Sequence, residues 1–204
     1  EHSIPNKTKS RHMARFGKGY KLHLTPLDPE KQHAVGGVAC VLRTTTKYVI
    51  APQPALDETA PFLQEGRLGL YAVHLGGDDY ILVYVVYGWQ GADDDPAAAD
   101  RTDDLMAQVV CDAKHQPHGP IMRVGDFNAT IRDTIPTLRD ALIAGWFVDV
   151  GENAQMWGEE PNVNTCFTHQ SAKRRDYVLA NPAALERIVG FQVSGEADLP
   201  THKI

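Results

Sequence analysis

Residues 121–131, IMRVGDFNATI, place a carboxylate and an amide directly after a short apolar run. Asp126 and Asn128 are both common turn residues and Gly125 is typical of a tight turn, so a purely structural role explains the pattern. A functional role explains it as well, because both side chains can face one target such as a water, a metal ion or a phosphate. The other candidate residues of the chain are needed to choose between these interpretations.

Four further residues have side chains suited to the same chemistry: Glu1, Tyr87, Asp176 and His202. Widely separated carboxylates, accompanied by one amide and one histidine, suit a hard cation such as Mg²⁺. Such a cation takes one or two carboxylates and completes its shell with water and substrate phosphate oxygens. The histidine can donate to a phosphate oxygen or transfer a proton. The set therefore predicts metal-assisted hydrolysis of a phosphate ester.

Strand ends are expected to position these residues. Residues 67–75 and 80–87 are β-rich runs separated by GGDD, which favours a hairpin, and Tyr87 ends the second run. The apolar strand 121–124 leads into the Gly-Asp-Phe-Asn turn, and the strand 176–180 begins with Asp176. Strand ends from distant parts of a chain can converge at one edge of a layered sheet, which is a common place for a site.

The other predicted elements complete a layered pattern. Further strands are expected at 35–43 and 188–193, a loop at 51–66, and helices over 96–114, from Pro136 to Gly145, and from Pro182. Asp95 before Pro96 is a good helix N-cap, and Gly145 is a natural helix stop. Because strands outnumber helices, we expect an α/β or α+β protein with packed sheets and outer helices.

The bulk properties are those of one globular domain. The chain has 204 residues, of which 43% are hydrophobic and 23% charged. The longest apolar run, residues 81–87, is far too short to span a bilayer, and no signal-peptide pattern is visible. Cys40, Cys111 and Cys166 form no CxxC pair, which argues against a disulfide framework and a structural zinc site. These features favour an intracellular setting without a membrane partner.

Charge is unevenly distributed along a chain whose formal net charge is −6. Residues 1–23 carry six basic side chains and Glu1, a net charge of +5, so residues 24–204 carry −11. A globally acidic protein is a poor match for a tight, non-specific nucleic-acid binder, which needs a basic surface. Two interpretations of this basic strip, residues 1–23, stay open. It can contact a few phosphates, or it can be a solvated segment without a binding role.

The order E…VYG…GDFN…RRDYVL…LPTH resembles the endonuclease/exonuclease/phosphatase superfamily, the fold shared with pancreatic-type deoxyribonuclease. The resemblance covers nearly the whole chain and treats residues 1–204 as a single domain that is truncated at both ends. It implies a four-layer α/β/β/α sandwich, with two packed mixed sheets and outer helices. It also implies a phosphodiesterase that depends on Mg²⁺ or Mn²⁺.

The resemblance assigns a role to each matching residue. Asp126 matches the residue that positions or deprotonates the attacking water, and Asn128 matches the amide that holds a phosphate oxygen. Asp176 matches the carboxylate that orients His202, which stabilises charge on the phosphoryl oxygens. Tyr87 matches an aromatic residue near the scissile phosphate.

The metal site of the family is matched less completely. Glu1 matches the metal-binding glutamate, with Asp126 beside it as a second metal-site carboxylate. The family has Asp immediately before its terminal His, whereas this chain has Thr201, and Asp198 is a candidate substitute. This departure puts the strength of metal binding in doubt.

Several residues favour nucleic acid as the substrate. Trp89 can stack on a base or sugar, although a packing role is the alternative. Arg174 and Arg175, in the run that starts at Lys173, can contact substrate phosphates. The stretches GGVACVLR and LPTHKI resemble the endonuclease module of a retroelement polyprotein, which would act in the nucleus.

Two alternatives to a nuclease stay open. The first is a phosphomonoesterase or a lipid- or inositol-phosphate hydrolase of the same superfamily, which the acidity of the chain favours. The second is a non-catalytic member that binds nucleic acid, an alternative motivated by Thr201.

Overall fold

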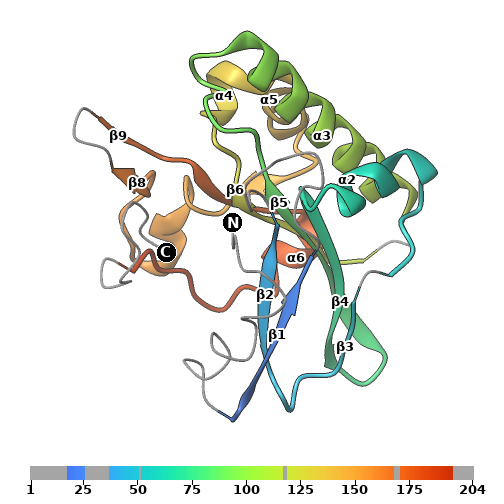
Figure 1. The fold of residues 1–204 in the computed structure, drawn as a ribbon. Coiled ribbons are helices and arrows are strands. Elements are labelled where there is room, and N and C mark those ends of the chain that lie inside the picture. The colour runs from blue at the N-terminus through green and yellow to red at the C-terminus, as the bar shows by residue number, and fades with distance from the viewer. Residues whose placement is uncertain (1–17, 26–36, 51, 117–118, 168–170, 195–204) are drawn as a thin grey trace.

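A mixed sheet of six strands, in the order β3-β4-β5-β6-β10-β7, forms the centre of the protein (Figure 1). The computed structural model describes residues 18–25, 37–50, 52–116, 119–167 and 171–194. The strands of the central sheet are β3 (Tyr48–Ile50), β4 (Leu68–Gly76), β5 (Asp79–Tyr87), β6 (Ile121–Asp126), β7 (Val148–Asp149) and β10 (Asp176–Ala180). Two further pairs are antiparallel, β1 (Tyr20–Leu24) with β2 (Ala39–Arg43), and β8 (Cys166–Phe167) with β9 (Ala172–Lys173).

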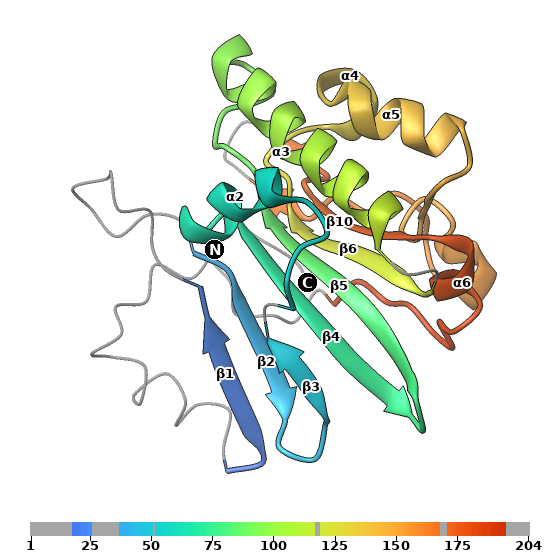
Figure 2. The same cartoon turned by 90° about the vertical axis from the view of Figure 1, so that its right-hand side faces the viewer.

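Helices cover one face of the central sheet. They are α2 (Ala60–Gln64), α3 (Pro96–His115), α4 (Ile131–Thr134) and α5 (Pro136–Ile143), and Figure 2 shows them side by side on that face. The short helix α6 (Pro182–Leu185) follows β10, and the 3₁₀ turns η2 (Asp57–Thr59) and η3 (Ala154–Trp157) lie in connections. Among the described residues, no helix has the length and apolarity needed to cross a membrane.

Local sequence signals explain the central supersecondary unit. β4 and β5 pair as an antiparallel hairpin, and the turn between them uses Gly76 and Gly77, both with positive φ. Asp95 caps α3 by accepting a hydrogen bond from the backbone N–H of Ala97 at 3.0 Å. Helix α3 then returns the chain so that β6 pairs with β5 in parallel. The predicted hairpin and the predicted helix over 96–114 are thereby confirmed, and the helix predicted from Pro136 to Gly145 is α5.

Side chains on β5 alternate between two cores, as the period of a strand requires. Leu82, Tyr84 and Val86 join the core beneath the helices. Ile81 and Val83 join a smaller core on the opposite face, together with α6. The β1–β2 pair lies on the side of the sheet away from the helices (Figure 2). Burial raises the pKa of Tyr71 of β4, with a smaller rise from Cys40 of β2.

The described layers are therefore helices, the six-stranded sheet and the β1–β2 pair. The predicted mixed α/β class is confirmed. Helices α2 to α5 all belong to one outer layer, so a second helical layer stays a prediction.

Two sequence-based expectations differ from the structure. The strand predicted at 188–193 is wrong, because this segment joins no ladder and is held by side-chain contacts. The indole N–H of Trp157 donates to the carbonyl of Ile188 at 3.1 Å, and the Trp157 and Phe191 rings lie 6.3 Å apart. The loop expected at 51–66 contains η2 and α2, with Pro61 in the first turn of α2, where its missing N–H is tolerated.

Candidate active site

Three of the predicted site residues lie in one row across the central sheet. Tyr87 of β5 is opposite Asp126 of β6 in the parallel pair, and Asp126 is opposite Asp176 of β10 in the antiparallel pair. Directly opposite residues of antiparallel strands have Cα atoms about 4.5–5.5 Å apart. The expected convergence of strand ends at one edge of the sheet is thus observed.

A cleft with a volume of 340 Å³ lies beside the two carboxylates. Asp126 and Asp176 are half-buried in its wall. Its other lining residues are Val124, Gly125, Gly151, Val163, Thr165, Arg174, Tyr177, Val178, Phe191, Gln192 and Val193. A concave, partly apolar site with convergent polar groups is the usual form of a small-molecule or substrate site.

Close backbone approach explains two glycines of the site. Gly125 has φ +141°, and a Cβ there would lie 2.0 Å from the carbonyl oxygen of Val86. A Cβ on Gly88 would lie 2.1 Å from the carbonyl oxygen of Phe127. The ends of β5 and β6 therefore pack backbone to backbone, which only glycine permits at these positions.

Asn128 closes the turn that carries Asp126. Its φ is +52°, in the left-handed region that asparagine tolerates, and its backbone N–H donates to Oδ1 of Asp126 at 2.8 Å. Its side-chain amide donates to the carbonyl of Gly88 at 3.1 Å, and only 5% of the residue is exposed. The turn role is therefore observed, and it fixes the orientation of the Asp126 carboxylate.

Aromatic residues at the end of β5 surround a buried arginine. The guanidinium of Arg67 lies over the Tyr87 ring at 4.9 Å and over the Trp89 ring at 4.7 Å, and it donates to the carbonyl of Gly88 at 3.2 Å. The guanidinium of Arg101 also lies over Trp89, at 4.5 Å.

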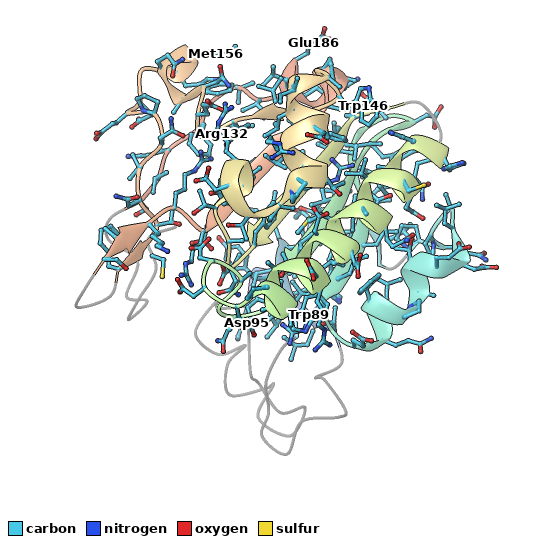
Figure 3. All side chains as sticks on the ribbon, turned by 90° about the horizontal axis from the view of Figure 1, so that it is seen from above. Trp89, Asp95, Arg132, Trp146, Met156 and Glu186 are labelled. Atoms are coloured by element: carbon cyan, nitrogen blue, oxygen red, sulfur yellow. The ribbon has the colours of Figure 1, made fainter. Side chains whose placement is uncertain are left out.

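Trp89 occupies a packing position. It lies against the first half of α3 (Figure 3), where its backbone N–H donates to the hydroxyl of Thr102 at 3.0 Å, and only 6% of it is exposed. With two guanidinium groups over its ring, the indole offers little surface for stacking on a base. The packing alternative agrees with this placement better than the predicted substrate contact does.

The basic run at 173–175 is engaged inside the protein. Arg174 binds Asp149 through both of its terminal nitrogens and also donates to Oδ1 of Asn162 at 2.9 Å. Lys173 and Arg175 both contact Oδ2 of Asp93, at 2.9 Å and 3.4 Å. The side chains of Asp93 and Asp149 are each 6% exposed, so the pairs with Arg174 and Arg175 are largely buried, whereas the Lys173 side chain is 36% exposed. Arg174, which lines the cleft, and Arg175 are thus both paired with carboxylates, and their contact with substrate phosphates stays a prediction.

Asp93 joins three segments around the site. Its Oδ1 accepts hydrogen bonds from the backbone N–H of Thr130 at 2.8 Å and the hydroxyl of Thr134 at 3.1 Å, while its Oδ2 binds the basic run. Burial by itself would raise the pKa of Asp93. The hydrogen bonds from Lys173 and Thr130 outweigh burial, so the pKa lies below its ordinary value.

Thr165 anchors the start of β10. Its hydroxyl accepts hydrogen bonds from the backbone N–H groups of Arg175 at 3.1 Å and Asp176 at 3.0 Å. The adjacent Cys166 thiol has a raised pKa, mainly through burial; Arg175 lowers it and the charges of Asp126 and Asp176 raise it. This thiol therefore lies in the field of both carboxylates.

Sequence reasoning did not single out Asp93, Asp149 or Arg67. The acidic run 93–95 and the end of β7 carry the two aspartates, but nothing local in the sequence indicates that each binds a distant cation.

Comparison with solved structures identifies the fold. The catalytic domain of Xenopus laevis APE2 superposes with a TM-score of 0.59 at 18% identity, over 83% of this chain and 68% of that chain. The 3′ phosphatase NExo from Neisseria, bound to a product DNA hairpin, superposes with a TM-score of 0.61 at 17% identity, over 98% of this chain and 80% of that chain. An endonuclease/exonuclease/phosphatase family protein from Bacteroides thetaiotaomicron gives a TM-score of 0.52 at 14% identity, over 84% and 64%.

The chain has the endonuclease/exonuclease/phosphatase fold. No protein-family model and no curated protein sequence matches it. The chain spans about two thirds of the length of the APE2 and Bacteroides chains.

The predicted metal ligands are only partly described. Glu1, Asp198, Thr201 and His202 lie outside the described residues. Within the described part of the chain, no group of three or more His, Cys, Asp or Glu residues could hold a metal ion. Asp126 and Asp176, however, are two hard oxygen donors placed directly opposite each other. Like charges in this position repel, so a bound cation fits their chemistry.

Proposed function

We propose that this protein is a metal-dependent hydrolase of phosphate esters and that its substrate is a nucleic-acid backbone. The observation that carries the proposal is the row Tyr87, Asp126 and Asp176, whose two carboxylates line the 340 Å³ cleft. The similar NExo structure holds product DNA, which supports the substrate class. Because a shared fold does not fix a substrate, the proposal rests first on the site.

Asp126 is the proposed base. Its carboxylate is half-buried and held by the backbone N–H of Asn128, so it can position a water molecule and accept its proton. Asp176 is proposed to orient His202, and Tyr87 to lie near the scissile phosphate. The Asn128 amide has two N–H groups, of which one is bonded to Gly88, and the second can donate to a phosphate oxygen.

Glu1 and Asp126 are the proposed ligands of Mg²⁺ or Mn²⁺. When bound, such an ion polarises a phosphoryl oxygen and neutralises negative charge. His202 is proposed to donate to the phosphoryl oxygens as charge develops on them.

Nicking of supercoiled plasmid tests the proposal. We expect nicking with magnesium, none with EDTA, and loss of nicking in Asp126→Asn and His202→Ala. Asp133→Asn is a matched control, since Asp133 is exposed on α4. A folded parent protein that binds DNA without any turnover would instead support the non-catalytic alternative raised by Thr201.

Hydrolysis of a small phosphate monoester is the second candidate function. The specific observation in its favour is that the cations nearest the cleft, Arg174 and Arg175, are bound to Asp149 and Asp93, which leaves fewer of them for a polymer backbone. Plasmid nicking, compared with phosphate release from inositol phosphates, distinguishes the candidates. Activity confined to the inositol phosphates would contradict a nuclease.

A further inference from the structure

A basic corner lies at the end of the central sheet opposite the candidate active site. It consists of residues 18–25 and 37–50, which include β1, β2 and β3. These residues carry Lys18, Lys21, Arg43 and Lys47 and contain no Asp or Glu, in a chain whose net charge is −6. Among the described residues, no salt bridge involves any of these four cations.

The corner contains a hollow lined by donors suited to phosphate. Its lining residues are Lys21, Thr44, Thr45, Thr46, Lys47, Tyr48 and His74, and its volume is 520 Å³. The backbone N–H of His74 donates to the carbonyl of Lys47 at 2.9 Å, which holds these two residues side by side. Ammonium and hydroxyl groups of this kind bind phosphate oxygens without reading sequence.

Aromatic side chains are interleaved with the cations. Lys21 Nζ lies 5.9 Å from the centre of the Tyr48 ring, and Tyr20 is 38% exposed at the start of β1. Cations combined with aromatic rings are typical of surfaces that bind single-stranded nucleic acid. The figures show the β1–β2–β3 end of the molecule free of the helical layer, which covers the other face of the sheet (Figure 2).

We propose that this basic corner binds the phosphate backbone of a nucleic-acid strand whose other end occupies the candidate active site. The inference rests on the proposed function and narrows its substrate to a polymer. Tyr48 pairs with Val73, and Val73 pairs with Ile81, which lies six residues before Tyr87 on β5. At about 3.3 Å per residue, the corner and the site are separated by roughly 20 Å. A strand of about six nucleotides spans this distance at 3.4 Å per step, whereas a small phosphate ester cannot.

Binding measured as a function of strand length tests the proposal. All binding is measured in the Asp126→Asn background, in which turnover should be lost. In this background, the protein with native Lys21 and Lys47 is compared with the double variant Lys21→Glu plus Lys47→Glu. The probes are fluorescent single-stranded DNAs of about three and about twenty nucleotides, which fall below and above the span estimated from the rise per nucleotide. We expect the double reversal to weaken binding of the long strand at least about tenfold and leave the short strand unchanged. The slope of log affinity against log salt should become shallower by about 1.4 for two lost phosphate contacts.

Charge-matched controls isolate the position of the change. Lys114→Glu plus Arg139→Glu makes the same change of charge on the helical layer, where Lys114 is exposed and the Arg139 side chain is 43% exposed, and it should leave the length dependence intact. Lys21→Gln plus Lys47→Gln is a milder variant that should give a smaller loss in the same direction, and it serves if the reversal impairs folding.

The outcomes separate this proposal from the proposed function. Equal loss in the corner and control variants, or no loss in either, would overturn the basic corner as a binding surface. Binding of phosphatidylserine vesicles without binding of DNA would overturn the choice of nucleic acid. Length-dependent binding by the Asp126→Asn protein, combined with no hydrolysis by the parent, would support the corner and contradict the enzyme.

Discussion

The two ends of the central sheet carry basic residues in opposite arrangements. At the candidate active site, Lys173, Arg174 and Arg175 are bound to Asp93 and Asp149, whose carboxylates are almost fully buried. At the basic corner, Lys21 and Lys47 line an open hollow with no acidic residue in their segments. The cations predicted to contact the substrate are paired with carboxylates, whereas Lys21 of the basic strip and Lys47 of the turn before β3 take part in no salt bridge among the described residues.

Electrostatics explains why the two arrangements behave differently. A buried charge is expensive to desolvate, so a cation inside the protein needs a partner, and loss of that partner is strongly destabilising. An exposed cation keeps its hydration, contributes little to stability and interacts with other charges in a salt-dependent way. Variants at the site end should therefore change activity and folding, whereas variants at the corner should change binding.

The largest expected effect is on turnover at the site end. Asp126→Asn removes the proposed base but keeps an acceptor for the Asn128 N–H, so the fold should persist. Loss of a general base lowers kcat by about 10²–10⁴-fold. Initial rates of phosphoester hydrolysis and a thermal melt test this together. Unchanged kcat in a folded variant would remove Asp126 from the mechanism.

The next effect is on stability through the buried ion pair. Asp149→Ala leaves Arg174 without its two-point partner and should cost about 3–5 kcal/mol in the free energy of unfolding. Asp140→Ala breaks an exposed pair with Arg139 and should cost less than about 1 kcal/mol. Urea unfolding of both variants measures the contrast. Similar costs would mean that the site-end pair is solvated.

Gly88→Ala tests how closely the strand ends pack. The added Cβ would meet the carbonyl of Phe127, and we expect a loss of about 1–3 kcal/mol through overpacking. Gly19→Ala is the comparison at the corner end, because nothing lies within 4 Å of a Cβ there. Midpoints of denaturant unfolding compare the two. A harmless Gly88→Ala would show that β5 and β6 can separate without cost.

The smallest expected effect is a pH dependence of stability that comes from Asp93 at the site end. Its pKa is lowered in the folded protein, so its stabilisation is present above the ordinary carboxyl value and is lost as pH falls through the folded value. The difference in Tm between the parent and Asp93→Asn should stay constant from neutral pH to about 4 and narrow below it. A difference that already narrows near neutral pH would point to another titrating group.

Short-range sequence signals accounted for the longest helices and strands. β5, β6, β10 and α3 follow from apolar runs, turn residues and caps, all of which act within a few residues. The row of Tyr87, Asp126 and Asp176 was likewise expected from their positions at strand ends, and the register places them in line. The predicted strand at 188–193 failed because an apolar run can also be held by side-chain contacts, here those of Trp157 with the Ile188 carbonyl and the Phe191 ring.

The sequence by itself determined which segments form strands and which of these strands end at a residue whose side chain can take part in catalysis. Both properties depend on neighbours in the chain. Only the tertiary structure decided the partner of each cation and the burial of Trp89. Asp93 and Lys173 are 80 residues apart in sequence, yet their side chains meet at 2.9 Å. Such contacts depend on how β10 and the loop after β5 come together in the folded protein, and no local pattern encodes that distance.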